Sequence, residues 1–306
     1  MKILVATPTG NIGQRIVREL LAPEFSVRVI VRDPLRLPDE VREQVEIIHG
    51  SMDDATTLRR ALDGADAMFF CVPTESMQER DVRGHYKRFA RAAAQAISEA
   101  RTPRVVTISA VGKGRARNAG PISALHTMED ILNESGAAIR HLRCGAFMEN
   151  FLWQAQAIAE HRVISYPMPG SVAIPMVATT DVADVALRWL VWRDWDGVAA
   201  AAVHGAEDLS WDKTAAVIER VLERPVRYQE LAVNAYMQKL LNRGASTEYA
   251  QSMIAMFTEL AAGIAQAEPR TYDSTTSTKL SEWAREELLP MFGNFVSESG
   301  TTVCGV

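Results

Sequence analysis

The first half of the chain alternates short apolar runs with stretches that carry apolar residues at helical spacing. Lys2 to Ala6 is apolar and predicts a strand, and Gln14 to Leu21 places apolar residues three and four positions apart, as one face of a helix does. The same rhythm predicts further strands at 27–31, 45–48, 67–72, 104–109 and 138–142, and helices at 55–62, 86–100 and 125–133. This alternation predicts a parallel sheet with helices on both faces. The run 67–72 is apolar throughout, so we expect it to be buried on both faces.

The pattern changes after about residue 150. Asp181 and Ser210 are expected as N-caps of two helices, and two further helices are expected to meet near Gly244. We expect a last helix over about 277–289 and a disordered tail after Phe295. These patterns predict a doubly wound α/β Rossmann domain over residues 1–150 and a smaller, mostly helical substrate lobe over 151–306, with strands at 163–166 and 199–203 returning to the main sheet.

Composition narrows the class of protein. The chain has 306 residues and a net charge of −5, so nothing in its charge favours nucleic acid or an anionic membrane as a partner. No apolar run reaches the roughly 20 residues of a membrane-spanning helix. Cys71, Cys144 and Cys304 are odd in number and widely spaced, which fits neither a disulfide framework nor a zinc site. We therefore expect a cytoplasmic protein without a metal centre.

The first strand is followed by a loop of the kind that binds phosphate. Thr7-Pro8-Thr9-Gly10-Asn11-Ile12-Gly13 lies between this strand and a predicted helix, where backbone N–H groups and the helix N-terminus can approach a pyrophosphate. Two of the three usual glycines are present, and Thr7 replaces the first. The alternative interpretation is a tight turn that binds no ligand.

The end of the second strand indicates which dinucleotide binds. NAD sites usually carry an acid there, whereas Arg32 follows Val31 in this chain. A planar guanidinium suits a 2′-phosphate, and Arg36 can add a second charge, so NADP(H) is the predicted cofactor. Asp33 comes next and leaves NAD open, and Arg32 can also be an ordinary surface arginine.

Two further loops follow strands at the same edge of the predicted sheet. Val72-Pro73 ends the fourth strand and is expected along the cofactor. Ser109-Ala110 ends the fifth strand, where Ser109 either binds the nicotinamide ribose or a substrate carbonyl, or simply caps the strand.

Taken together, these segments resemble the NmrA-like branch of the atypical short-chain dehydrogenase/reductases. The matching motifs, in order along the chain, lie at 6–13, 31–34, 49–54, 64–67, 106–110, 134–136, 143–151 and 180–185. The resemblance implies an NADP(H)-binding Rossmann domain, with Thr9 to Ile12 along the pyrophosphate, Arg32 at the 2′-phosphate and Gly145-Ala146-Phe147 along the nicotinamide. It implies one of two functions: an NADPH-dependent reductase of quinones or other conjugated carbonyls, or a redox sensor that binds a protein partner without turnover.

The catalytic pair of typical short-chain dehydrogenases is missing. None of the six tyrosines has a lysine four residues later, and Leu125 occupies the position where the resemblance would place the lysine. Hydride transfer to a quinone or an activated alkene depends mostly on positioning the cofactor. His126 is the best-placed proton donor, and its alternative interpretation is a surface histidine without a role.

The expected substrate is small, apolar and conjugated: a carbonyl, a quinone or an imine. The pocket residues expected from the sequence are Phe147, Met148, Asn150, Phe151 and Trp153, with Tyr236, Met253, Met256 and Phe257 as further candidates. For the apolar residues the alternative is ordinary core packing. Asn150 and Glu149 either orient the substrate or cap the following helix. An NADPH-dependent reductase is the favoured function, and a non-catalytic NADP(H) sensor is the alternative.

Overall fold

The main sheet has seven parallel strands. The computed structural model describes residues 1–102 and 104–292, and in it the strands have the order β10-β6-β5-β4-β1-β2-β3. Their bounds are β1 (Lys2–Val5), β2 (Ser26–Val31), β3 (Glu46–His49), β4 (Ala67–Phe70), β5 (Arg104–Ala110), β6 (Ala138–Cys144) and β10 (Val198–Val203). The chain moves outward in both directions from the β1–β4 pair, so the topological switch point lies between these strands. This confirms the predicted doubly wound fold.

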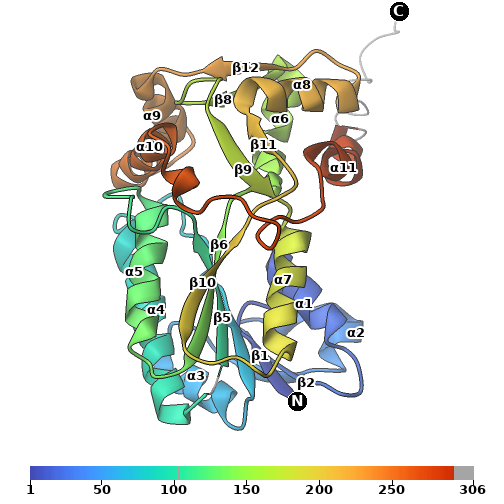
Figure 1. Cartoon of the computed structure of the whole chain (residues 1–306), viewed down its shortest axis with the longest axis vertical. Helices are drawn as coiled ribbons and strands as arrows, with labels where there is room; N and C mark the ends of the chain where they lie inside the picture. Colours follow the sequence, from blue (N-terminus) through green and yellow to red (C-terminus); the bar gives the residue numbers. More distant parts are fainter. Residues whose placement is uncertain (103, 293–306) are drawn as a thin grey trace, which may run out of the picture.

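Helices cover both faces of this sheet. One face carries α1 (Asn11–Glu19) and α7 (Thr179–Val191), and the other carries α3 (Ala55–Leu62), α4 (Val82–Ala100) and α5 (Pro121–Asn133) (Figure 1). The short helix α2 (Asp39–Arg42) lies between β2 and β3. All four residues of β4 are buried, as the continuous apolar run predicts, because side chains on both of its faces pack against helices.

The helical lobe lies beyond the carboxyl edge of the main sheet (Figure 1). It has a three-stranded sheet of β11 (Asp208–Ser210), β9 (Ala173–Val177) and β7 (Ala146–Phe147), and a pair of β12 (Arg227–Glu230) with β8 (Val163–Tyr166). Its helices are α6 (Ala155–His161), α8 (Trp211–Leu222), α9 (Val233–Asn242), α10 (Thr247–Ala261) and α11 (Leu280–Trp283). The lobe has a hydrophobic core of its own, rich in methionine and aromatic side chains.

Several expectations for this second half are confirmed. The strand expected at 199–203 joins the main sheet as β10 beside β6. Ser210 caps α8, where its hydroxyl oxygen accepts the Lys213 N–H at 3.3 Å. The break near Gly244 separates α9 from α10, and the φ of +87° at this glycine is one that other residues rarely adopt.

Two expectations about particular elements are wrong. The strand at 163–166 pairs with β12 inside the lobe and not with the main sheet, because Ile164 is buried in the lobe core. Asp181 does not cap α7, which already begins at Thr179; the Asp181 carboxylate accepts the Thr278 hydroxyl at 2.7 Å instead. The last helix expected over about 277–289 is confirmed: α11 begins at Leu280, passes through a π-helical turn over Ala284–Leu288 and continues as α-helix over 289–292. The tail after Phe295 lies outside the described residues.

The contacts between the lobe and the main sheet include backbone hydrogen bonds in two regions. The chain between the short 3-10 helix Ile264–Ala267 and α11 crosses the carboxyl edge, where His204 at the end of β10 exchanges backbone hydrogen bonds with Ser274 and Thr276 (Figure 1). The loop after β4 meets the start of α10, where the Ser246 N–H donates to the Met77 carbonyl at 2.8 Å. No helix in the described part of the chain is long and apolar enough to cross a membrane.

Candidate active site

The loop between β1 and α1 is closely packed at one glycine and open at the other. A Cβ atom on Gly13 would lie 1.8 Å from the Thr7 carbonyl oxygen, so α1 can approach the loop this closely only with glycine at this position. A Cβ atom on Gly10 would lie 3.8 Å from the same oxygen, which is ordinary contact. The open space beside Gly10 is therefore available to a ligand, while Gly13 shapes the turn.

The N-terminus of α1 is free to bind an anion. This nine-residue helix has Gly10 as its N-cap, and its first turn contains no acidic residue. Among residues 1–102 and 104–292, no side chain accepts a hydrogen bond from its first amides. Thr9, Gly10 and Asn11 are exposed, whereas Pro8 and Ile12 are buried beneath them. Unpaired N–H groups and the positive end of the helix dipole suit a pyrophosphate, so this segment fits the phosphates of a dinucleotide.

The side chains after β2 suit a 2′-phosphate better than a ribose hydroxyl. Arg32 and Arg36 are both exposed. Asp33 caps the 3-10 turn Pro34–Arg36, and its carboxylate accepts the Leu35 N–H at 3.0 Å. The Asp33 carboxylate, which holds this turn, is less available to a ribose. The Arg32 and Arg36 guanidinium groups are exposed and can approach a phosphate.

The predicted residues at the ends of β4 and β5 lie at the same edge of the sheet. Val72 is buried and Pro73 is exposed, and the Pro73 carbonyl accepts the His85 Nε2–H at 2.8 Å. Ser109 is 2% exposed and donates its hydroxyl to the Glu129 carboxylate at 2.5 Å. This bond favours the structural interpretation of Ser109.

His126 lies on α5 with its ring against the end of β5. Its Nε2–H donates to the Ala110 carbonyl at 2.9 Å, because a carbonyl oxygen can only accept. Burial lowers the pKa of His126 below its usual value, so the neutral ring predominates at neutral pH. Its single N–H is then committed to the backbone, an arrangement that favours a structural role for this residue.

A buried ionic network beneath α5 was not predicted from the sequence. Glu129 is 1% exposed and binds the Arg143 guanidinium through two hydrogen bonds of 3.1 and 2.8 Å. Arg143 also contacts Glu268 of the lobe at 3.0 Å, and Lys113 lies 3.1 Å from Glu129. Burial alone would raise the pKa of Glu129, but the bonds from Arg143 and Ser109 lower it to about 2. Only the tertiary fold brings these charges together, and no local pattern indicates the network.

Glu268 links the lobe to the end of β5. Its second carboxylate oxygen accepts the Gly112 N–H at 2.6 Å, and its backbone carbonyl accepts the His204 Nε2–H at 3.0 Å. Through Arg143 it also reaches β6. One carboxylate thus fixes the β5–α5 loop relative to the segment of the lobe that crosses the carboxyl edge.

The segment after β6 begins at the edge of the main sheet and continues into the lobe. Gly145 is buried, and a Cβ atom there would lie 2.5 Å from the Pro175 carbonyl oxygen. Ala146 and Phe147 form β7 and are half-buried. Glu149 accepts the Thr179 N–H at 2.9 Å, so it caps α7 and not the helix that follows it.

The predicted pocket residues do not line one common surface. Met148 and Phe151 are each 2% exposed and belong to the lobe core, as do Tyr236 and Phe257. Trp153 is 78% exposed, and Asn150 is also exposed. Phe147 is the half-buried member of the set. The packing interpretation therefore holds for Met148 and Phe151, and Phe147 keeps its place as a candidate beside the ligand.

Two cysteines lie at strand ends near this edge. Burial raises the pKa of Cys71 to about 12 and that of Cys144 further still. Both thiols therefore stay protonated and unreactive at neutral pH.

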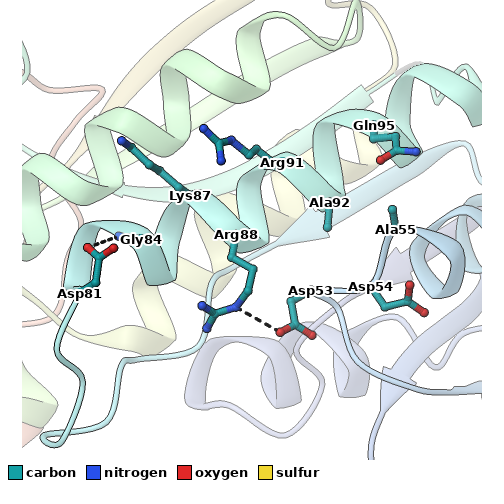
Figure 2. A pocket seen from close by; sticks show the side chains of 10 residues that line it. All are labelled: Asp53, Asp54, Ala55, Asp81, Gly84, Lys87, Arg88, Arg91, Ala92 and Gln95. Atoms are coloured by element: carbon teal, nitrogen blue, oxygen red, sulfur yellow. Dashed lines mark hydrogen bonds and ion pairs between the residues drawn. The ribbon is translucent and has the colours of Figure 1, made fainter.

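A separate groove of about 530 Å³ lies between the start of α3 and the outer face of α4 (Figure 2). Arg88 and Asp53 form an ion pair of 3.4 Å within it, and Asp54 caps α3 by accepting the Thr56 and Thr57 N–H groups. None of the residues predicted for the dinucleotide lines this groove. Within the described residues, no group of three or more His, Cys, Asp or Glu side chains is arranged to hold a metal ion.

The parallel sheet, its switch point and the loop of Gly10 and Gly13 define a Rossmann-type dinucleotide-binding protein. Comparison with known proteins narrows this class further. The chain belongs to the NmrA-like family, whose model matches residues 1–285. This confirms the resemblance noted in the sequence.

Two relatives by sequence carry enzyme names. The chain is 32% identical over 242 residues to the (4-alkanoyl-5-oxo-2,5-dihydrofuran-3-yl)methyl phosphate reductase of Streptomyces griseus, covering 78% of this chain and 80% of the relative. It is 28% identical over 257 residues to the NAD(P)H azoreductase of Xenophilus azovorans, covering 82% and 84% of the two chains.

A solved structure shares the fold. The NADPH-dependent quinone oxidoreductase of Escherichia coli in complex with NADPH superposes with a TM-score of 0.79 at 20% identity, over 95% of this chain and all of that one. This likeness shows a shared fold. Both named sequence relatives are reductases, which supports a general NAD(P)H-dependent oxidoreductase.

Proposed function

We propose that this protein is an NADPH-dependent reductase that transfers hydride to a small conjugated carbonyl, quinone or imine without a Tyr-x-x-x-Lys pair. The observation that carries this proposal is the β1–α1 loop. Gly13 allows α1 to lie against Thr7, and the uncapped amides at the start of α1 face solvent beside Gly10. A pyrophosphate is the ligand that this arrangement suits best.

NADP(H) is the proposed cofactor. Arg32 and Arg36 are exposed after β2, and Asp33 is engaged in capping a turn. Two guanidinium groups next to the adenosine end of the site favour a 2′-phosphate. The proposed site continues along Val72 and Pro73, then Ala110, to Gly145, Ala146 and Phe147.

Bound dihydronicotinamide supplies the hydride, so the chemistry itself belongs to the cofactor. The protein's part is to hold that ring and the acceptor together at the carboxyl edge. Gly145 lets the chain after β6 pass close to Pro175 of β9, and the half-buried ring of Phe147 offers an apolar contact. The names of the two sequence relatives, a butenolide phosphate reductase and an azoreductase, support a conjugated acceptor.

The source of the proton is distinct from the source of the hydride. His126 stays a candidate, but it would first have to release the Ala110 carbonyl. This commitment of its N–H is also the observation that favours the second candidate function, an NADP(H)-sensing regulator of a protein partner that catalyses no turnover. A cytoplasmic location stays an expectation of the sequence.

Steady-state kinetics separate the two functions. Purified protein is mixed with NADPH and a neutral acceptor such as 1,4-naphthoquinone, and absorbance at the reduced nicotinamide band is followed. The reductase predicts sustained NADPH oxidation that is lost in Gly10→Val, in which the side chain fills the space beside the loop. Tight NADPH binding without oxidation of any acceptor would refute the reductase and favour the regulator.

A further inference from the structure

Strand β10 forms one edge of the main sheet, and among the described residues it pairs with β6 alone. Its sequence, Val-Ala-Ala-Ala-Ala-Val, contains no charged residue and no proline, and its first three residues are exposed. Proteins normally protect an edge strand with charges, a proline or a covering segment, because its free N–H and C=O groups can pair with another strand. The opposite edge, β3, has the charged residue Glu46, which pairs with Arg28 at 2.9 Å. Only the β10 edge therefore lacks such protection.

The hydrogen bonds of β10 show which of its backbone groups face outward. The Gly197 carbonyl accepts the Ile139 N–H of β6 at 3.0 Å. Because the backbone groups of successive residues in a strand point to opposite sides, the odd-numbered residues of β10 face β6 as Gly197 does. Val198, Ala200 and Ala202 therefore face away from β6, and they offer their N–H and C=O groups to a further strand.

This open stretch is limited at both ends. His204 also faces outward, but its N–H donates to the Ser274 carbonyl at 2.7 Å and its carbonyl accepts the Thr276 N–H at 2.8 Å, where the segment before α11 crosses the end of β10 (Figure 1). At the other end, Gly197 has a φ of +61° and the chain bends before β10 begins. A further strand can therefore pair with residues 198–202 and no further in either direction.

A second copy of β10 fits this stretch. In an antiparallel pair, the backbone groups of two opposed residues either both face each other or both face away. A two-fold axis at Ala200 meets this condition, because Ala200 then lies opposite the same residue of the second copy and Val198 lies opposite Ala202. Each copy supplies the outward-facing residues that the other needs, over the same length. The small alanine side chains of both strands leave room for this approach.

Exposed aromatic side chains lie toward the two ends of the stretch. Before β10, Trp192 is 52% exposed and packs on Trp189 with 5.3 Å between ring centroids, and Trp189 in turn packs on Arg140 of β6. After β10, Tyr272 is 95% exposed in the segment that bridges to His204. Antiparallel pairing brings the start of one strand beside the end of the other, so Trp192 of one copy and Tyr272 of the other come to the same end of the pair. Their contact adds apolar burial beyond the strands themselves.

We propose that this protein forms a homodimer in which the two β10 strands pair antiparallel about a two-fold axis at Ala200 and join both seven-stranded sheets into one. The interface also covers part of the segment that begins at Glu268, whose carboxylate binds the Gly112 N–H at 2.6 Å. The second copy therefore supports the segment that fixes the β5–α5 loop. Because the paired stretch is short, the dissociation constant is expected on the order of 1–10 µM.

Sedimentation velocity of the full chain from about 0.1 to about 100 µM tests the dimer. Ala200→Pro removes an outward N–H that β6 does not use, and an edge strand tolerates proline at such a position. Ala200→Lys places two ammonium groups opposite each other at the axis. Leu35→Lys is the matched control, because Leu35 is 79% exposed and follows β2, away from β10 in the strand order.

The wild type is expected to pass from monomer to dimer over this range. Ala200→Pro and Ala200→Lys raise the dissociation constant about tenfold or more, and high salt recovers part of the affinity only in Ala200→Lys. Tyr272→Ala raises it about three- to tenfold, as expected for a lost aromatic contact. Because Tyr272 is 95% exposed in the single chain, its urea midpoint at about 0.1 µM, where monomers predominate, stays unchanged. Leu35→Lys changes neither value.

Other results overturn the proposal. A wild type that remains a monomer at about 100 µM has no such interface. A dimer that both Ala200 variants leave intact uses another surface, and assembly that continues beyond the dimer contradicts a closed two-fold pair. If the urea midpoints show that both Ala200 variants are unfolded, Tyr272→Ala decides, and a dissociation constant equal to that of the wild type refutes the β10 interface.

Discussion

Replacing Arg143 should reverse the pH dependence of the contribution that Glu129 makes to the free energy of unfolding. The guanidinium group makes two hydrogen bonds to Glu129 and one to Glu268. Methionine at this position keeps much of the aliphatic volume and removes the charge. Glu129 is 1% exposed, and in the variant its remaining cationic partner is Lys113 at 3.1 Å.

The size of the effect follows from the burial of Glu129. Breaking a buried ion pair by deleting one partner costs about 3–5 kcal/mol, and the remaining Lys113 places Arg143→Met near the lower end, about 3 kcal/mol at pH 8. In the wild type the pKa of Glu129 is lowered from 4.5 to about 2, so its ionised form stabilises the fold above pH 4.5.

The variant should show the opposite sign. Without Arg143, burial raises the folded-state pKa of Glu129 above its unfolded value, so its neutral form is stable at low pH and the penalty grows as pH rises through that pKa. The stability difference between wild type and Arg143→Met should therefore be larger at pH 8 than at pH 5. Each unit of pKa change corresponds to about 1.4 kcal/mol.

Urea unfolding followed by tryptophan fluorescence at pH 5 and pH 8 measures this difference. The double variant Glu129→Gln/Arg143→Met should recover the part of the loss that comes from Glu129, whereas the part that comes from Glu268, which also pairs with Arg143, should remain. The control Arg15→Met breaks an exposed ion pair with Asp184 and should cost less than about 1 kcal/mol at either pH. A loss below about 1 kcal/mol for Arg143→Met, or one of equal size at both pH values, would refute the reasoning.

Two further predictions concern the phosphate loop and a buried histidine. Gly13→Ala should lower the free energy of unfolding by about 1–3 kcal/mol and abolish NADPH binding, because there is no room for a Cβ atom at Gly13. Gly10→Ala should fold normally, because a Cβ atom there would make ordinary contact. Equal urea midpoints for the two variants would contradict this expectation. His141 accepts the Thr107 hydroxyl and donates to Asn133, and burial lowers its pKa from 6.5 to about 4. The contribution of His141 to the free energy of unfolding should thus be fully present above pH 6.5 and should fall by up to about 3 kcal/mol as the pH drops to 4. His141→Asn should flatten this slope in urea titrations, while the exposed control His161→Asn should not, and an unchanged slope in His141→Asn would assign the acid sensitivity elsewhere.

The main sheet was predictable because each of its strands and helices carries its own periodic pattern. The apolar run at 67–72 contains β4, and the helical spacing at 55–62 has the same bounds as α3. The lobe was harder, because its strands are short and pair across distant segments. Nothing local in Val163–Tyr166 indicates that its partner is Arg227–Glu230 and not the main sheet.

The residues of the candidate site also differ in how far the local sequence predicts them. The phosphate loop and Arg32 follow directly from sequence order, since each comes immediately after a predicted strand. Met148 and Phe151 were expected in a pocket and lie in the lobe core, because an apolar side chain looks the same in either place. Glu129 and Glu268 gave no signal in the sequence, because their importance depends on which charged side chains the tertiary fold brings to them.

The most direct test of the account is calorimetric titration of the purified protein with NADPH and with NADH. The account predicts micromolar binding of NADPH and binding of NADH that is about 10- to 100-fold weaker, as expected for a charge-assisted contact to the 2′-phosphate. Arg32→Ala should remove this preference, and Arg220→Ala on α8 should leave it intact. Failure to bind either dinucleotide, or a preference for NADH, would contradict the account.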